Sequence, residues 1–165
     1  MQAPESPREL TLKQLVGWAE ANPKLSPLVA IARESQGDDS AHDMHHFWRV
    51  ALWTLRLGGS ETDPAEAVAA ALLHDLVNVP KNHPDRAKAS EFSAEKALPV
   101  LLQSGFTAAA AARIASAIRT HSFSRGETPE GVLGQALQDA DRLEALGAIG
   151  TMRVFSTGVR MGTRY

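Results

Sequence analysis

The chain has 165 residues, a formal net charge of -2 at pH 7 and no cysteine. A chain of this length forms one domain with a sizeable core, and it has neither disulfides nor a thiolate metal site. Lysine and arginine are scattered, so the extended basic surface of a nucleic-acid-binding protein is missing. No signal core or apolar run of about 20 residues occurs, so we expect a soluble, cytoplasmic protein without a membrane partner.

Helical periodicity runs through most of the chain. Residues 1–9 are a polar, proline-containing lead-in that we expect to be flexible. Residues 158–165 form a poorly defined end with no helix stop, as in a fragment of a longer chain. We therefore expect an all-α, single-domain helical bundle over residues 10–157. From their apolar spacing and caps, the helices are expected at about residues 11–22, 27–35, 42–57, 64–75, 90–101, 107–121 and 128–146.

His74 and Asp75 end a helical segment, residues 65–73, that is small or apolar except at Glu66. Burying ionisable groups is costly unless they are paired or bind a metal ion. Adjacent helical side chains lie about 100° apart, so both can reach one ion beside the helix. A helix packed on all sides is also a rigid mount for ligands. The alternative is a core histidine bonded to a backbone carbonyl, with Asp75 exposed.

His46 lies on the most apolar stripe of its predicted helix and should face inward. His42 is one turn earlier, and histidines at i and i+4 are a known metal-binding arrangement. Asp43 is close enough to accept a hydrogen bond from a ring nitrogen of His46. His45 points elsewhere. The alternative for this cluster is a capped helix start with solvated polar residues.

Three further polar residues are candidates for the chemistry. Lys81 and Arg86 belong to a polar loop, residues 79–88, beside the proposed site. Such cations can hold a phosphate through charge-assisted hydrogen bonds, although ordinary surface loops have the same composition. His121 is predicted at a helix C-terminus. There it either caps the helix or reaches the cleft and protonates a leaving group, and we favour the second role.

Two aspartates near the end of the chain differ in the direction they face. Asp141 lies four residues from both Leu137 and Ala145, on an apolar stripe, whereas Asp139 is turned away by about 200°. Asp141 is therefore the better candidate for a buried ligand.

These residues fall in four ordered blocks that resemble a known signature. The blocks are His42-Asp43-x-x-His46-x-x-Arg49-Val50, Leu72-Leu73-His74-Asp75, Ala117-Ile118-x-x-His121-Ser122-Phe123 and residues 139–150. They resemble the H…HD…D signature of the HD-domain metal-dependent phosphohydrolase superfamily, in its small bacterial single-domain branch typified by YedJ and YpgQ. The resemblance covers about residues 10–157, although such relatives usually continue for several dozen residues. It implies an all-α bundle with one divalent ion, and hydrolysis of phosphate esters or nucleotide phosphoanhydrides.

The same residues can be assigned chemistry on general grounds. Two imidazoles and two carboxylates, from His46, His74, Asp75 and Asp141, neutralise one divalent ion and leave two octahedral positions open. One position suits water, which the ion activates for attack, and the other suits a phosphoryl oxygen. Mixed nitrogen and oxygen ligands favour Mn, Fe, Co, Ni or Zn over Mg. Asp75 or Asp139 can relay the proton.

The sequence thus predicts a metal-dependent phosphohydrolase acting on a small phosphorylated substrate, a nucleotide or a related ester or anhydride. The proposed catalytic residues are Asp75, His121, Lys81 and Arg86. The alternatives are a metal-binding sensor or regulatory domain with little or no turnover, and a helical interaction module without metal. Base preference, the phosphate cleaved, the metal and the oligomeric state stay open.

Overall fold

The structure is a computed structural model that describes residues 6–35, 43–79, 83–160 and 162–163, and it confirms the all-α fold class. Three short 3-10 helices connect longer ones: η1 (Gly59–Glu61), η2 (Pro84–Lys88) and η3 (Phe123–Arg125). No helix of this described part is long and apolar enough to cross a membrane. The α-helices are α1 (Leu12–Ala21), α2 (Ser26–Glu34), α3 (Met44–Gly58), α4 (Pro64–Leu73), α5 (Ala89–Gln103), α6 (Ala108–Thr120), α7 (Gly131–Leu143) and α8 (Gly147–Arg160).

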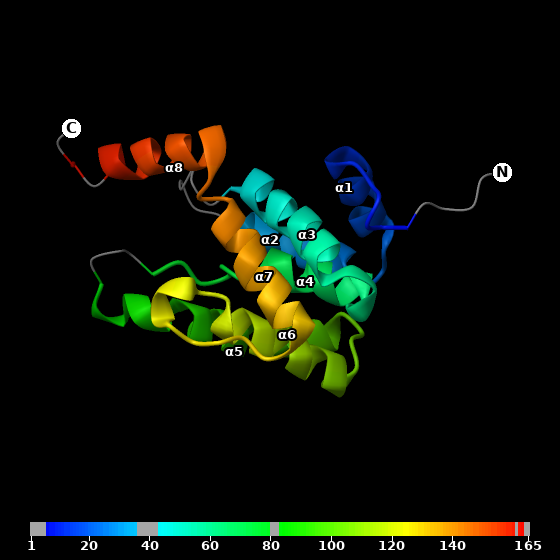
Figure 1. Ribbon diagram of the computed structural model, residues 1–165. Helices are drawn as coiled ribbons and strands as arrows, with labels where there is room; N and C mark the ends of the chain where they lie inside the picture. Colours follow the sequence, from blue (N-terminus) through cyan, green and yellow to red (C-terminus); the bar gives the residue numbers. More distant parts are fainter. Residues whose placement is uncertain (1–5, 36–42, 80–82, 161, 164–165) are drawn as a thin grey trace.

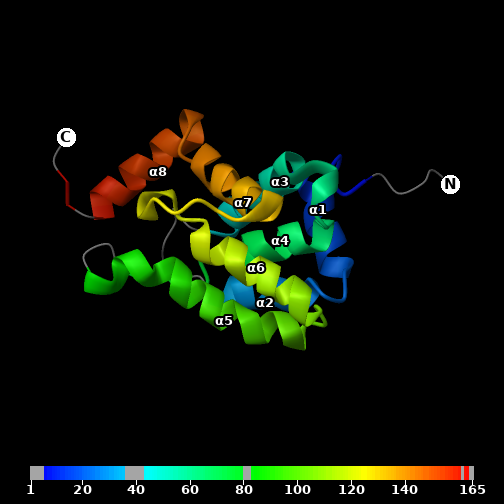
Figure 2. The same ribbon diagram turned by 60° about the horizontal axis from the view of Figure 1, so that its bottom comes forward.

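Helix α4 is the centre of the bundle, as its all-round apolar sequence predicts. Residues 66–73 are all buried, and α2, α3, α5, α6 and α7 contact the helix (Figures 1 and 2). Asp63 caps the helix by accepting hydrogen bonds from two backbone N–H groups of the first turn, and Pro64 follows it. Glu66 is paired with Arg113 of α6, whose Nη2 donates at 2.5 Å. These contacts hold the N-terminal end of α4, and burial of residues 66–73 keeps its C-terminal end inside the core.

The last predicted helix has wrong boundaries at both ends, and a glycine with positive φ accounts for its later start. The last predicted helix was expected to run from Thr128 to Leu146, but α7 begins only at Gly131 and ends at Leu143. Gly131 has φ 68° and Gly147 has φ 65°, in the left-handed region, so neither can lie inside a right-handed helix. The chain therefore turns at Gly147 and α8 leaves the bundle in a new direction (Figure 1).

Two predictions at other helix starts have different outcomes. Thr107 caps α6 as expected, by accepting a hydrogen bond from the backbone N–H of Ala110. Ser90 was expected to cap α5, but η2 leads directly into this helix, which begins at Ala89 with Lys88 at the cap position. Ser90 is therefore inside the first turn and buried.

The N-terminal lead-in makes contacts with the bundle. Residues 1–5 lie outside the described part of the chain. Arg8 donates hydrogen bonds to the backbone carbonyls of Gly59 at 2.6 Å and Thr62 at 2.5 Å. These bonds connect the start of the chain to the turn between α3 and α4.

Overfilling the core around α4 should destabilise the fold. Ala70 is fully buried, so Ala70→Leu forces its neighbours off their preferred rotamers and should lower the free energy of unfolding by about 1–3 kcal/mol. Urea denaturation followed by circular dichroism measures the change. The matched control is Ala112→Leu at an exposed position of α6, with an expected change within about 0.5 kcal/mol. Equal losses in both variants would contradict the central position of α4.

Candidate functional site

His46 is fully buried in the first turn of α3, as its place on the apolar stripe predicts. Its ring Nδ1 lies 3.4 Å from Glu144 Oε2, and its Nε2 lies 3.5 Å from Asp141 Oδ1. The expectation for Asp43 is corrected: its carboxylate accepts a hydrogen bond from the backbone N–H of His46 at 2.9 Å and caps the helix. The acceptor next to the ring is Glu144 instead.

His74 is the C-terminal cap of α4 and is also fully buried. Its Nδ1–H donates to the backbone carbonyl of Ala71 at 2.7 Å, which leaves the lone pair on Nε2. Within the described part of the chain Nε2 has no hydrogen-bond partner, and it lies 3.6 Å from Asp75 Oδ2 and 3.9 Å from Asp141 Oδ1. Burial lowers the pKa of His74 to about 4, so the ring is neutral near pH 7.

The four residues predicted from the sequence as ligands come together in space. Ligand atoms of His46, His74 and Asp75 all lie within 4.8 Å of one another, and Asp141 Oδ1 faces both imidazoles. Asp139 is turned outward, with its side chain 57% exposed and bound to Arg142 at 3.1 Å. The predicted directions of the two aspartates are therefore confirmed.

The chemistry of this cluster fits a divalent ion. A buried neutral imidazole nitrogen without a hydrogen-bond partner, on His74, is unfavourable unless it binds something. Two carboxylates next to it supply the negative charge that a divalent cation requires. The alternative reading, a core histidine bonded to a backbone carbonyl, accounts for Nδ1 of His74. It does not account for Nε2, which has no hydrogen-bond partner among the described residues.

His121 both caps its helix and reaches the pocket, the two positions that the sequence left open. It caps α6, and its Nδ1–H donates to the backbone carbonyl of Ile118 at 2.7 Å. Its Nε2 lies 3.6 Å from Asp75 Oδ1, on the floor of the site. Burial lowers the pKa of His121, but the hydrogen bond and charge of Asp75 outweigh this effect, so the net shift is upward.

Glu144 is a buried carboxylate to which the sequence analysis assigned no role. Its Oε2 accepts hydrogen bonds from Arg49 Nε at 2.8 Å and Nη2 at 2.6 Å, besides facing the His46 ring. Burial raises its pKa, but hydrogen bonds from His46 and Arg49 and the charge of Arg49 lower it more strongly, to about 2. Its position three residues after Asp141, on the same helical face, was a signal that could have identified it.

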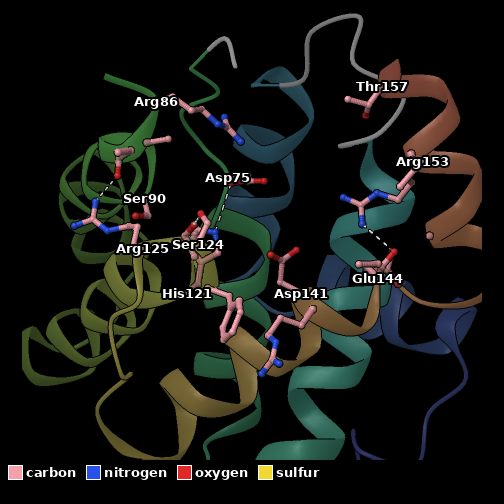
Figure 3. Close-up of a pocket in the computed structure, with 18 of the residues that line it drawn as sticks. Asp75, Arg86, Ser90, His121, Ser124, Arg125, Asp141, Glu144, Arg153 and Thr157 are labelled. Carbon is pink, nitrogen blue, oxygen red and sulfur yellow. Dashed lines mark hydrogen bonds and ion pairs between the residues drawn. The ribbon is translucent and has the colours of Figure 1, made fainter. Parts of the chain in front are cut away.

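A pocket of about 1130 Å³ opens above this cluster. Its floor includes Asp75, His121 and Asp141, and its walls come from η2, η3, the start of α5, and α8. Figure 3 shows Ser90, Ser124 and Arg125 on one side of the floor, and Glu144, Arg153 and Thr157 on the other. His42 and Lys81 lie outside the described residues, and His45 is exposed on α3 as expected.

Arg86 lies in the pocket wall, near Asp75 in Figure 3. Its Nη1 donates to the backbone carbonyl of Val79 at 2.8 Å and to Asn78 Oδ1 at 3.4 Å. These bonds fix the guanidinium, and Arg86 forms no ion pair with any described residue. The loop cation predicted from the sequence is therefore placed where it can meet a ligand.

The sequence around the site matches a known domain family. The family model for the HD domain matches residues 44–146, which include His46, His74, Asp75 and Asp141. The chain belongs to the HD domain family. Its similarity to YpgQ supports the YpgQ-like branch: the uncharacterized protein YpgQ of Bacillus subtilis (strain 168) is 37% identical over 123 residues, 72% of this chain. The match spans 58% of the length of that relative.

Solved structures of HD proteins resemble the whole fold. A predicted HD superfamily hydrolase from an uncultured Thermotogales bacterium superposes with a TM-score of 0.67 at 34% identity, over 90% of this chain and 82% of that one. Bacillus subtilis YpgQ in complex with ADP superposes with a TM-score of 0.62 at 29% identity, over 87% and 71% of the two chains. The HD fold and its His/Asp cluster are thus both present here.

Acid should expose the contribution of Glu144 to stability. Its folded-state pKa of about 2 lies below the ordinary value of 4.5, so between these values the unfolded chain binds more protons and the fold loses stability as pH falls. Glu144→Gln should be less stable than wild type near pH 6 by about 3 kcal/mol at most, and the difference should shrink below pH ~4.5.

Urea denaturation at several pH values, in buffer with a chelator, measures this difference without any contribution from metal. The control is Glu95→Gln at an exposed position, and its free energy of unfolding should equal that of wild type at every pH. A difference between Glu144→Gln and wild type that stays constant from about pH 6 to about pH 3 would show that Glu144 does not act through its charge.

Proposed function

We propose that the protein is a metal-dependent phosphohydrolase that hydrolyses a nucleotide or a related small phosphate ester or anhydride. The main support is the convergence of His46, His74 and Asp75 within 4.8 Å, next to Asp141, at a large pocket. Membership of the HD domain family supports the class of hydrolase.

The proposed ligands of one divalent ion are His46, His74, Asp75 and Asp141. Their mixed nitrogen and oxygen donors favour Mn, Fe, Co, Ni or Zn over Mg. Such an ion, when bound, polarises a phosphoryl group and lowers the pKa of nearby water. Glu144 lies next to Nδ1 of His46, and the Ala71 carbonyl accepts from Nδ1 of His74. Both rings therefore direct Nε2 to the same point.

His121 is the proposed general acid. Its Nδ1–H is committed to the Ile118 carbonyl, so the proton that it can exchange is on Nε2, which faces Asp75. The carboxylate of Asp75 raises the pKa of His121 and so increases the fraction of rings that hold this proton near neutral pH. Transfer of the proton to the leaving oxygen would complete hydrolysis.

Arg86 is the proposed phosphate-binding residue. Its Nη1 is held by backbone and side-chain acceptors, and its other nitrogens remain to donate to phosphate oxygens. The other pocket arginines that the structure describes, Arg125, Arg142 and Arg153, are each paired with a carboxylate. Lys81, outside the described residues, is proposed for the same role on its sequence position alone.

A nucleotide is the proposed substrate for two reasons. The similar structure of Bacillus subtilis YpgQ is a complex with ADP. The pocket volume of about 1130 Å³ slightly exceeds that of common ligand sites, which enclose roughly 300–1,000 Å³, so there is room for a nucleoside as well as its phosphates.

Metal binding should depend on the inward aspartate and not on the outward one. Asp141→Ala should bind less than a tenth of an equivalent of Mn²⁺ or Zn²⁺ after reconstitution, whereas Asp139→Ala should bind about one equivalent. Elemental analysis after gel filtration measures the metal content. The ion should also raise the melting temperature of Asp139→Ala but not of Asp141→Ala, because it binds only the folded state. The reverse pattern would overturn the ligand assignment.

Turnover should require the metal, Asp75 and His121. We expect wild-type protein with Mn²⁺ to hydrolyse at least one member of a panel of nucleoside mono-, di- and triphosphates, and chelation to abolish the activity. His121→Ala should keep its metal but lose about 100-fold or more in kcat, as expected for a lost general acid. Phosphate release measures the rate.

The matched control for His121 is His45, which is exposed on α3 and whose replacement by alanine should leave kcat unchanged. If Asp75→Ala and wild type release phosphate equally slowly from every nucleotide, the proposed activity is wrong. Stoichiometric metal without turnover on any nucleotide would instead identify a metal-binding sensor domain.

A further inference from the structure

Phe123 is a large aromatic side chain left 58% exposed in the wall of the pocket. Single exposed apolar residues are common on protein surfaces and need no explanation. Phe123 differs because it lines a pocket, where a ligand that covers the ring would gain the free energy of removing apolar surface from water. It begins η3, two residues after His121, so its backbone is close to the floor of the site.

The loop that carries Phe123 is fixed to a neighbouring helix. Arg125, also in η3, donates from Nη1 to the backbone carbonyl of Ala87 and from Nη2 to Glu91, both at 2.5 Å. It also donates to Glu127 at 2.7 Å. These bonds hold η3 against the start of α5, so the exposed ring has a rigid mount and little entropy is lost when a ligand stacks on it.

The ring of Phe123 is held in turn by Arg142 of α7. The Arg142 guanidinium carbon lies 4.1 Å from the ring centroid, a close cation–π contact, and Nη1 donates to Asp139 at 3.1 Å. The guanidinium stacks on the ring, and 58% of Phe123 is still exposed to a ligand in the pocket. Because Asp139 balances the charge of Arg142, this part of the pocket suits a neutral flat group better than a phosphate.

We propose that Phe123 is the stacking platform for the heteroaromatic base of the substrate, and that Arg142 fixes the platform in place. This inference rests on the proposed nucleotide phosphohydrolase activity and adds the residue that recognises the nucleoside. The phosphate oxygens then bind at Arg86 and the carboxylate floor, and the base binds at η3, in a separate part of the pocket.

A second aromatic side chain in the pocket provides a matched control. Phe155 lines the pocket from α8 and is 49% exposed, similar to Phe123. It lies on α8, which follows the turn at Gly147, whereas Phe123 lies on η3. Phe123→Leu and Phe155→Leu therefore make the same chemical change in two walls of one pocket.

Equilibrium binding of two non-hydrolysable probes tests the platform. Adenosine 5′-(α,β-methylene)diphosphate carries a base, and methylenediphosphonate has the same two phosphorus groups without a nucleoside. Isothermal titration calorimetry in the presence of Mn²⁺ should show that Phe123→Leu binds the first probe roughly tenfold more weakly than wild type, as expected when base stacking is lost. Its affinity for methylenediphosphonate should change less than twofold.

Two further variants make the test specific. Phe155→Leu should bind both probes as wild type does. Phe123→Trp keeps an aromatic face, so it should keep the affinity for the adenosine probe, and its fluorescence should change with this probe but not with methylenediphosphonate. Unchanged affinity of Phe123→Leu for the adenosine probe, equal losses for both probes, or the loss appearing in Phe155→Leu instead, would each overturn the proposal.

Failure of the platform and failure of the activity give different results. Wild-type turnover of nucleotides together with unchanged probe binding by Phe123→Leu overturns the platform alone. Absent turnover together with a Phe123-dependent affinity for the adenosine probe overturns the activity alone. Thermal melts of all variants check folding, and little change is expected because the ring of Phe123 is exposed.

Discussion

The burial of two imidazole rings against two carboxylates is the constraint on which the rest of the site depends. His46 and His74 have no solvent contact, so each ring nitrogen must find a partner inside the protein. The Ala71 carbonyl takes the Nδ1 proton of His74, and Glu144 lies beside Nδ1 of His46. These acceptors on the far side of each ring direct both Nε2 atoms to the same point, and the proposed metal site rests on this arrangement.

The bundle places the ends of its helices around this point. His74 caps the C-terminus of α4, His121 caps that of α6, and Glu144 caps that of α7. Each helix C-terminus carries a partial negative charge from carbonyls without helical partners, and three of them near one point favour a cation. Because α4 is buried along its length, His74 is fixed at the end of a helix packed inside the core, whereas the pocket walls come from shorter or more peripheral elements.

Periodicity predicted the parts of the site that depend on helical geometry. The stripe that buries His46 and the rotation that separates Asp141 from Asp139 both follow from 100° per residue, and the structure agrees with them. Helical spacing from Asp141 could have marked Glu144 as inward, but its pairing with Arg49, 95 positions away in the sequence, depends on the tertiary fold. The turns at Gly131 and Gly147 were missed because hydrophobic spacing carries no information on the sign of φ.

The charges around the pocket explain why a phosphate and a cation would bind together. Asp75 and Asp141 on the floor are two carboxylates, and in the absence of a cation they would repel a phosphate that approaches them. Of the pocket arginines in the described part of the chain, three already have carboxylate partners, so Arg86 alone cannot offset this repulsion. A divalent ion held by these carboxylates would neutralise the floor, so on the proposed function substrate affinity would depend on metal occupancy through charge.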